Sequence, residues 1–140
     1  MNVILKNIIV IIVGLFVGGF INMKLIEIGS SIIPPPEGVD MTTAEGLVEG
    51  MSLLQPMNFI FPFLAHALGT LVSAFIVAKF TKTNKFNFAM LIAAFFMLGG
   101  IIMVVMVGGP LWFNVLDLVG AYFPMGWLGY KLAGGNDSMS

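Results

Sequence analysis

The sequence lacks cysteine and arginine and contains little charge of either sign. Without cysteine the chain can form no disulfide, no thiolate metal site and no cysteine nucleophile. The chain contains six lysines and seven acidic residues, which gives a formal net charge of -1. It therefore lacks the positive electrostatic field that nucleic-acid binding needs. These absences exclude thiol chemistry and predict that nucleic acid is not a partner.

Apolar side chains are present in excess. Of the 140 residues, 59% are hydrophobic and 9% are charged, and the mean hydropathy is +1.04, whereas soluble proteins contain about 25% charged residues. A soluble core of this size cannot bury so much apolar surface, but a bilayer accepts it on every face of a helix. We therefore predict an all-α membrane protein, surrounded by the lipid bilayer, with residues 1–140 as a single domain.

Four apolar stretches are long enough to cross about 30 Å of hydrocarbon, which takes roughly 20 helical residues. The predicted transmembrane helices cover residues 4–28, 57–79, 87–108 and 110–132. We expect an up-down bundle, with Gly108-Gly109-Pro110 as a tight turn between the last two helices. The first helix is interpreted as an uncleaved anchor, because no A-x-A-like cleavage site follows it. The small, polar residues 134–140 are expected to be disordered.

The lysines predict the orientation, because the cytoplasmic flanks of membrane helices carry the excess of basic residues. Five of the six fall on one side of the predicted bundle, namely Lys6, Lys79, Lys82, Lys85 and Lys131. The opposite side holds the acidic outer loop, residues 30–55. Lys24 is the exception, and Glu27 follows three residues later, where a local ion pair can form. Both termini are therefore expected in the cytoplasm.

The outer loop is expected to contain a short amphipathic helix. Pro34-Pro35-Pro36 favours extended polyproline geometry and cannot continue a helix. Thr42-x-x-Glu45 then matches a capping box, and apolar residues recur after it at helical spacing. These residues are Ala44, Leu47, Val48, Met51 and Leu54. The pattern suits a helix at the lipid interface and equally one on top of the bundle.

Small residues let membrane helices approach closely, and two of the predicted spans contain them at the required spacing. They are Gly14 and Gly18 in the first span, and Ala65, Gly69 and Ser73 in the second. We interpret them as helix-packing residues inside one bundle rather than as a dimer seam. Pro62 and Pro124 are expected to kink the second and fourth helices, because each removes a backbone hydrogen bond.

His66 and Asp117 are the most informative residues, because ionisable groups inside a bilayer are expensive and normally face the protein interior. His66 precedes Lys79 by 13 residues, and Asp117 precedes Lys131 by 14. At about 1.5 Å per residue, the two side chains lie at nearly the same depth. The second and fourth helices run in the same direction, so a contact between His66 and Asp117 is geometrically reasonable.

Other polar residues extend this candidate cluster. One narrow stripe of the fourth helix is expected to face inward, and it consists of Asn114, Asp117, Ala121 and Pro124. Thr70 and Ser73 lie one and two turns from His66, on roughly the same side of the second helix. The candidate intramembrane polar cluster is therefore His66, Thr70, Ser73, Asn114 and Asp117.

Two interpretations of this cluster stay open. In the first, it is a hydrogen-bonded contact that fixes the register of the helices. In the second, it handles protons or ions, with a histidine that titrates near neutral pH and an aspartate that supplies the counter-charge. Neither applies if one of the two residues lies near the membrane interface.

The sequence offers little for catalysis or for a cofactor. A single histidine cannot build a multi-histidine zinc site or ligate haem from two sides, and Ser73 lies outside any G-x-S-x-G motif. Ser73 and His66 are two turns apart on one helix, which is too far for a nucleophile–base hydrogen bond. The thirteen Phe and eleven Met are interpreted as lipid-facing or packing residues. We expect no catalytic, cofactor-binding or metal-binding residue, and no enzyme activity.

Two segments, FIFPFLAHALGT (59–70) and WFNVLDLVGAYFPMGW (112–127), suggest a small bacterial membrane protein and imply no particular activity. We therefore expect a multi-pass protein of the bacterial inner membrane that acts as an accessory or scaffold subunit, with a membrane-protein partner or as a homo-oligomer. The alternative is a small transporter or channel component that uses His66 and Asp117.

Overall fold

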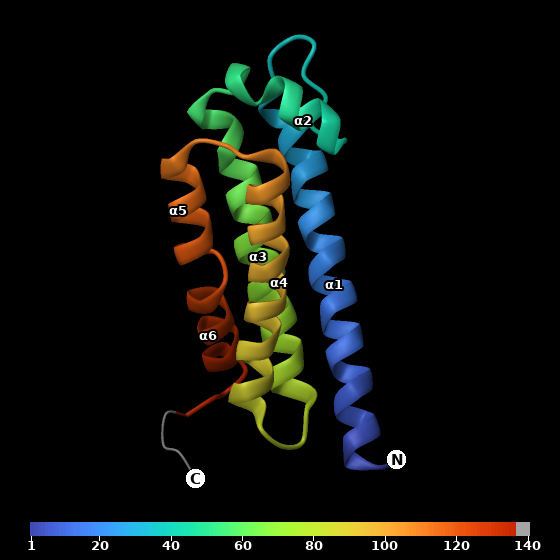
Figure 1. Ribbon diagram of the computed structural model, residues 1–140. Helices are drawn as coiled ribbons and strands as arrows, with labels where there is room; N and C mark the ends of the chain where they lie inside the picture. The colour runs from blue at the N-terminus through green and yellow to red at the C-terminus, as the bar shows by residue number, and fades with distance from the viewer. Residues whose placement is uncertain (137–140) are drawn as a thin grey trace.

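The computed structural model describes residues 1–136, and within that range the chain forms helices and connecting turns without a strand (Figure 1). The elements are α1 (Val3–Ile32), α2 (Ala44–Gly50), the 3₁₀ turns η1 (Met51–Leu53) and η2 (Pro56–Phe59), α3 (Ile60–Phe80), α4 (Lys85–Val107), α5 (Leu111–Gly120) and α6 (Phe123–Leu132). The predicted helical class is confirmed for these residues.

Three helical segments are long and apolar enough to cross a membrane. They are Val3–Ile32, Pro56–Phe80 and Lys85–Val107, and they agree with the first three predicted spans. The chain therefore has the features of a multi-pass helical membrane protein.

The fourth predicted span, 110–132, is not one continuous helix. α5 ends at Gly120 and α6 begins at Phe123, so two helices of ten residues each replace it. Pro124 is the physical reason, because it has no N–H for the Gly120 carbonyl and its ring crowds that carbonyl. Each half is about 15 Å long, and the two lie one above the other beside the longer helices (Figure 1).

Pro62, expected to kink a helix, does not do so. It occupies the first turn of α3, directly after η2, where backbone N–H groups have no intrahelical acceptor in any case. The second span therefore changes from 3₁₀ to α geometry at its outer end instead of bending in its middle.

α3 is the centre of the fold, since α1, α4 and α6 all pack against it while α1 barely touches α4. The contact with α1 depends on small residues. A Cβ atom on Gly18 would lie 2.5 Å from the Gly69 carbonyl oxygen, and one on Gly14 would lie 2.7 Å from a methyl group of Val77. Ala65 is also fully buried. These residues pack helices together within one chain.

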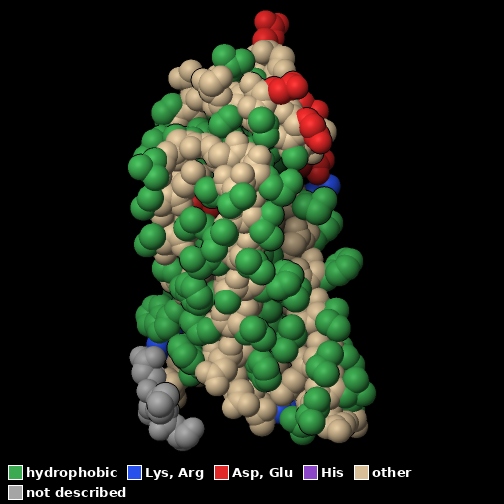
Figure 2. Space-filling view, in the orientation of Figure 1, with side chains coloured by type: hydrophobic (Ala, Val, Ile, Leu, Met, Phe, Trp, Pro, Cys, Tyr) green, Lys and Arg blue, Asp and Glu red, His purple; other side chains and the backbone are tan. Residues whose placement is uncertain are grey.

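The two ends of the molecule differ in charge. Figure 2 shows the acidic side chains gathered at the end that carries α2, while the start of α1, the α3–α4 turn and the end of α6 share the opposite end (Figure 1). Asn7 of α1 accepts a hydrogen bond from the Lys82 N–H at 3.0 Å and so ties α1 to that turn. At the acidic end Lys24 donates to Glu27 at 2.7 Å, which confirms the expected ion pair.

The segment between α1 and α3 folds over the acidic end of the bundle, and α2 packs against α4. Its cap is Thr43, whose hydroxyl accepts from the Gly46 N–H at 3.1 Å. Thr42, the predicted cap, instead donates to Asp40 at 2.6 Å. Its side chain and backbone hold the pKa of the Asp40 carboxyl below its usual value. The predicted capping residue was one position early, because Asp40 binds Thr42.

Gly134 to Asn136, expected to be disordered, instead close the end of α6. The Gly135 N–H donates to the Tyr130 carbonyl at 3.0 Å, and the Tyr130 hydroxyl donates to the Asn136 carbonyl at 2.8 Å. Gly134 turns the chain with a φ of +91°, which glycine adopts without strain. The remainder of the predicted tail lies outside the described residues.

Candidate functional site

The structure brings His66 of α3 into contact with Asp117 of α5. His66 Nδ1 lies 2.8 Å from Asp117 Oδ1 and 2.9 Å from Oδ2. The contact holds the imidazole in one orientation, and Nδ1 is the donor when the carboxyl group is ionised, because an ionised carboxylate only accepts hydrogen bonds. Asp117 is only 3% exposed, and a carboxylate so far from water requires partners of this kind.

Tyr122 is a third member of the site and was not predicted from the sequence. Its hydroxyl donates to Asp117 Oδ2 at 3.1 Å, and its ring stacks on that of His66 with the centroids 5.9 Å apart. On a continuous helix, Asp117 and Tyr122 would point about 140° apart around the axis. The break between α5 and α6 turns Tyr122 inward. Pro124 was the signal in the sequence from which this break, and so Tyr122, could have been found.

Gly100 of α4 provides the space for the Tyr122 side chain. A Cβ atom at position 100 would collide with the Tyr122 hydroxyl, whereas one at the neighbouring Gly99 would meet nothing within 4 Å. A residue larger than glycine at position 100 would therefore displace the hydroxyl that bonds to Asp117.

Of the other predicted cluster members, Asn114 joins the site and two do not. Asn114 lines the same cavity as His66 and Asp117, and its Nδ2 donates to the Gly109 carbonyl at 3.4 Å. Thr70 and Ser73 are buried on α3 with hydroxyl groups that have no hydrogen-bond partner. Ser73 packs against Gly14 and Gly18, so it faces α1.

The predicted inward stripe of the fourth helix also ends early. Asn114, Asp117 and Ala121 face the protein, but Pro124 is exposed because the chain direction changes at the break. The stripe was derived from a continuous helix, and only the part that lies before the break is retained.

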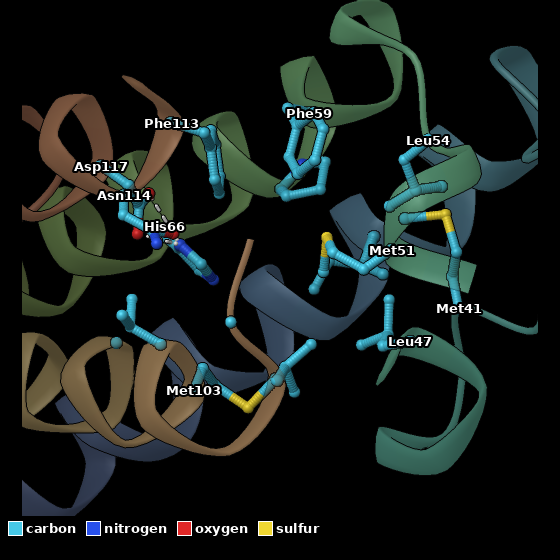
Figure 3. A pocket seen from close by; sticks show the side chains of 16 residues that line it. Met41, Leu47, Met51, Leu54, Phe59, His66, Met103, Phe113, Asn114 and Asp117 are labelled. Atoms are coloured by element: carbon cyan, nitrogen blue, oxygen red, sulfur yellow. Dashed lines mark hydrogen bonds and ion pairs between the residues drawn. The ribbon is translucent and has the colours of Figure 1, made fainter. Parts of the chain in front are cut away.

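His66, Asn114 and Asp117 form the polar wall of a cavity of about 120 Å³ (Figure 3). Leu47 of α2, Met51 of η1 and Met103 of α4 contribute to its apolar remainder. Three of the methionines interpreted as lipid-facing or packing residues therefore line an internal space, namely Met41, Met51 and Met103.

Aromatic rings hold the start of α5 against the start of α3 beside this cavity. The Phe59 and Phe113 rings have centroids 4.6 Å apart, and the Phe59 and Trp112 rings meet edge-on at 5.5 Å. Such pairs stabilise a contact beyond the area that they bury. They set the distance between α3 and α5 at the outer end.

The site combines a fixed imidazole, a buried carboxylate and an apolar space. Among the described residues no group of three His, Asp or Glu side chains could hold a metal ion. No protein-family model, curated protein or solved structure matches this chain. Its function is therefore argued from the site itself.

Proposed function

We propose that this chain is a non-catalytic protein of the bacterial inner membrane that acts as an accessory or scaffold subunit. α1, α3 and α4 are its first three spans, and α5 with α6 is a fourth that is broken in its middle. The end rich in lysine, with both termini, faces the cytoplasm. The acidic end with α2 faces outward.

The observation that carries this proposal is the closed inner half of the bundle. A core of small and apolar side chains fills it, each at most 1% exposed: Ala74, Val77, Ala78, Ala89 and Ile92. The polar groups at the site bond to one another on the outer side of this core. This packed core separates the polar site from the lysine-rich end, and this favours a role in binding over conduction.

The surface also supports a binding role. Phe16 and Phe20 of α1 are 80% and 60% exposed, and α1 contacts little besides α3. In a bilayer such a face is covered by lipid or by a helix of another subunit. We assign this face of α1 to the partner.

The test is purification from native membranes through a C-terminal tag in mild detergent, followed by mass and composition analysis. We expect a second membrane protein in fixed stoichiometry. A Phe16→Ala, Phe20→Ala double variant should lose it, while Leu111→Ala, at an exposed position on α5, should retain it. Recovery of the chain alone, as a monomer, would contradict the accessory role.

A second candidate function is a small transporter or channel component. The break between α5 and α6 favours it, because interrupted helices near mid-membrane are a feature of transporter binding sites. The unpartnered hydroxyls of Thr70 and Ser73 also add polar groups on the inner side of His66. A chain of this size would need several copies to enclose a path.

Reconstituted vesicles distinguish this second candidate. If it is correct, vesicles containing the protein leak protons or ions, and Asp117→Asn and His66→Ala each remove the leak. The same low flux for the wild type and both variants would exclude a transport role for these residues.

A further inference from the structure

The cavity beside His66 has the size of one small ring. Its volume of about 120 Å³ is close to the roughly 150 Å³ of an engineered apolar cavity that binds benzene. A six-membered ring therefore fits.

The lining of the cavity suits an aromatic ring in particular. Phe59 and Phe113 contribute rings, and Met51 and Met103 contribute thioether groups (Figure 3). Ring–ring and sulfur–aromatic contacts both favour an aromatic ligand over an aliphatic ligand of the same size. Methionine also adapts its shape to what it contacts, so this wall can close around a ring.

A ring nitrogen of His66 belongs to the polar wall of this otherwise apolar space. His66 bonds to Asp117 through Nδ1, its side chain remains 20% exposed, and Figure 3 shows the far end of its ring directed into the cavity. Nε2 is thus left for a ligand. It accepts a hydrogen bond when the imidazole is neutral and donates one when it is charged. A hydroxyl group can pair with it in both states.

We propose that this cavity binds an uncharged, hydroxyl-bearing aromatic ring, such as that of a phenol or a quinol, with the hydroxyl group on His66 Nε2. Asp117 is a positioning residue, because it holds the imidazole through Nδ1. The proposal goes beyond the accessory role and does not rest on it, so either one can fail without the other.

A wider cavity of about 520 Å³ adjoins the first on the outer face. The two share Met51, Leu54 and Phe59 as a common wall, and Trp112 lies at the outer one. A ring that carries an apolar tail would have room for the tail there. The ligand can thus be a free phenol or the head of a lipid-soluble molecule.

The single histidine of the chain provides a direct readout. Histidine labelled with ¹⁵N gives imidazole NMR signals that belong to His66 alone, provided that the full chain carries a histidine-free tag in lipid nanodiscs. The probes are p-cresol and toluene, which share a ring and a methyl group and differ by the hydroxyl group.

We expect p-cresol to shift the Nε2 signal saturably, with an affinity about 3- to 10-fold higher than that of toluene, as one hydrogen bond provides. Equal affinities for the two probes, or a shift that does not saturate, would overturn the proposal.

A cavity-filling variant locates the ring. Leu47→Trp fills the cavity from α2, which is not one of the long helices of the bundle. It should abolish the response to p-cresol while the Nδ1 signal stays unchanged. Glu49→Trp, on the exposed side of α2, should retain the response. If Leu47→Trp loses the Nδ1 signal, Val104→Phe fills the same cavity from α4. A response to p-cresol that survives cavity filling would refute this site.

A tail-bearing probe distinguishes the two sources of the ligand. Tighter binding of 4-octylphenol than of p-cresol, compared at equal concentration in the lipid phase, indicates a lipid-soluble ligand. Exclusion of 4-octylphenol while p-cresol binds indicates a small free phenol. Failure of both probes to bind contradicts the ring site.

Discussion

α5 and α6 are the two halves of one interrupted segment, yet they pack in different ways. α6 lies close to α3 and α4 because Gly126 and Gly129 bring its backbone near theirs, whereas α5 contacts α3 much less. Aromatic rings and the contact between His66 and Asp117 connect α5 to α3 across this wider separation. The difference shows how one break in a helix lets one half, α6, pack closely into the bundle while the other half, α5, leaves room for a cavity.

The largest effect is expected from removing the pair that ties α5 to α3. His66→Ala leaves the buried Asp117 carboxyl group with Tyr122 alone, and a buried acceptor that loses a hydrogen-bond partner costs about 1–3 kcal/mol, or more if it is charged. Denaturation in detergent measures the free energy of unfolding. Leu68→Ala, at a more exposed position of α3, is the control, and a similar loss in both variants would show that the pair does not hold α5.

The next effect concerns the close packing of α6. A Cβ atom at Gly129 would lie 2.5 Å from the Leu71 carbonyl oxygen and 2.9 Å from the Phe75 nitrogen. Backbone atoms cannot rotate away, so Gly129→Ala should cost about 1–3 kcal/mol. Gly99→Ala meets nothing within 4 Å and should be neutral or stabilising by up to about 1 kcal/mol. Equal unfolding free energies for both variants would argue against the close approach of α6.

A smaller effect is expected at Gly100, where the obstructing group is the tip of a side chain. Gly100→Ala should push the Tyr122 hydroxyl from Asp117 and cost about 1 kcal/mol, the worth of one hydrogen bond. In a Tyr122→Phe background the same change should cost less, since that bond is already absent. A double-mutant cycle measures this coupling, and strict additivity would mean that Gly100 acts independently of the site.

The smallest effect concerns the cover over the cavity. Thr43→Ala removes the cap of α2 and should destabilise that short helix by about 1 kcal/mol. Faster hydrogen exchange at the amides of Ala44–Gly50 would report it. Thr42→Ala, which removes the bond to Asp40, should leave this exchange nearly unchanged. Faster exchange in Thr42→Ala but not in Thr43→Ala would instead support the capping box predicted from the sequence.

The sequence predicted much of the fold because membrane spans depend on length and hydropathy, which are local properties. The first three spans agree with the structure to within a few residues. The comparison of depths also led to the contact between His66 and Asp117, because in a membrane the lysines at the helix ends provide a common reference.

The features that were missed depend on a change of backbone direction. Pro124 was recognised as an interruption, but its consequence for Tyr122 requires knowing how far the chain turns at Ala121 and Tyr122. The cavity was missed for a related reason. Methionines on separate elements face one space only after α2 has folded onto α4, and a composition rich in methionine does not indicate that.

The contact between His66 and Asp117 also has a consequence for biosynthesis. The two residues are 51 positions apart in the chain, so at about 5–20 residues per second the ribosome adds Asp117 roughly 3 to 10 seconds after His66. During that interval the imidazole has no carboxylate partner. A segment made after α4 therefore completes the polar site, and a chain truncated before α5 would have a histidine without this carboxylate partner among its apolar helices.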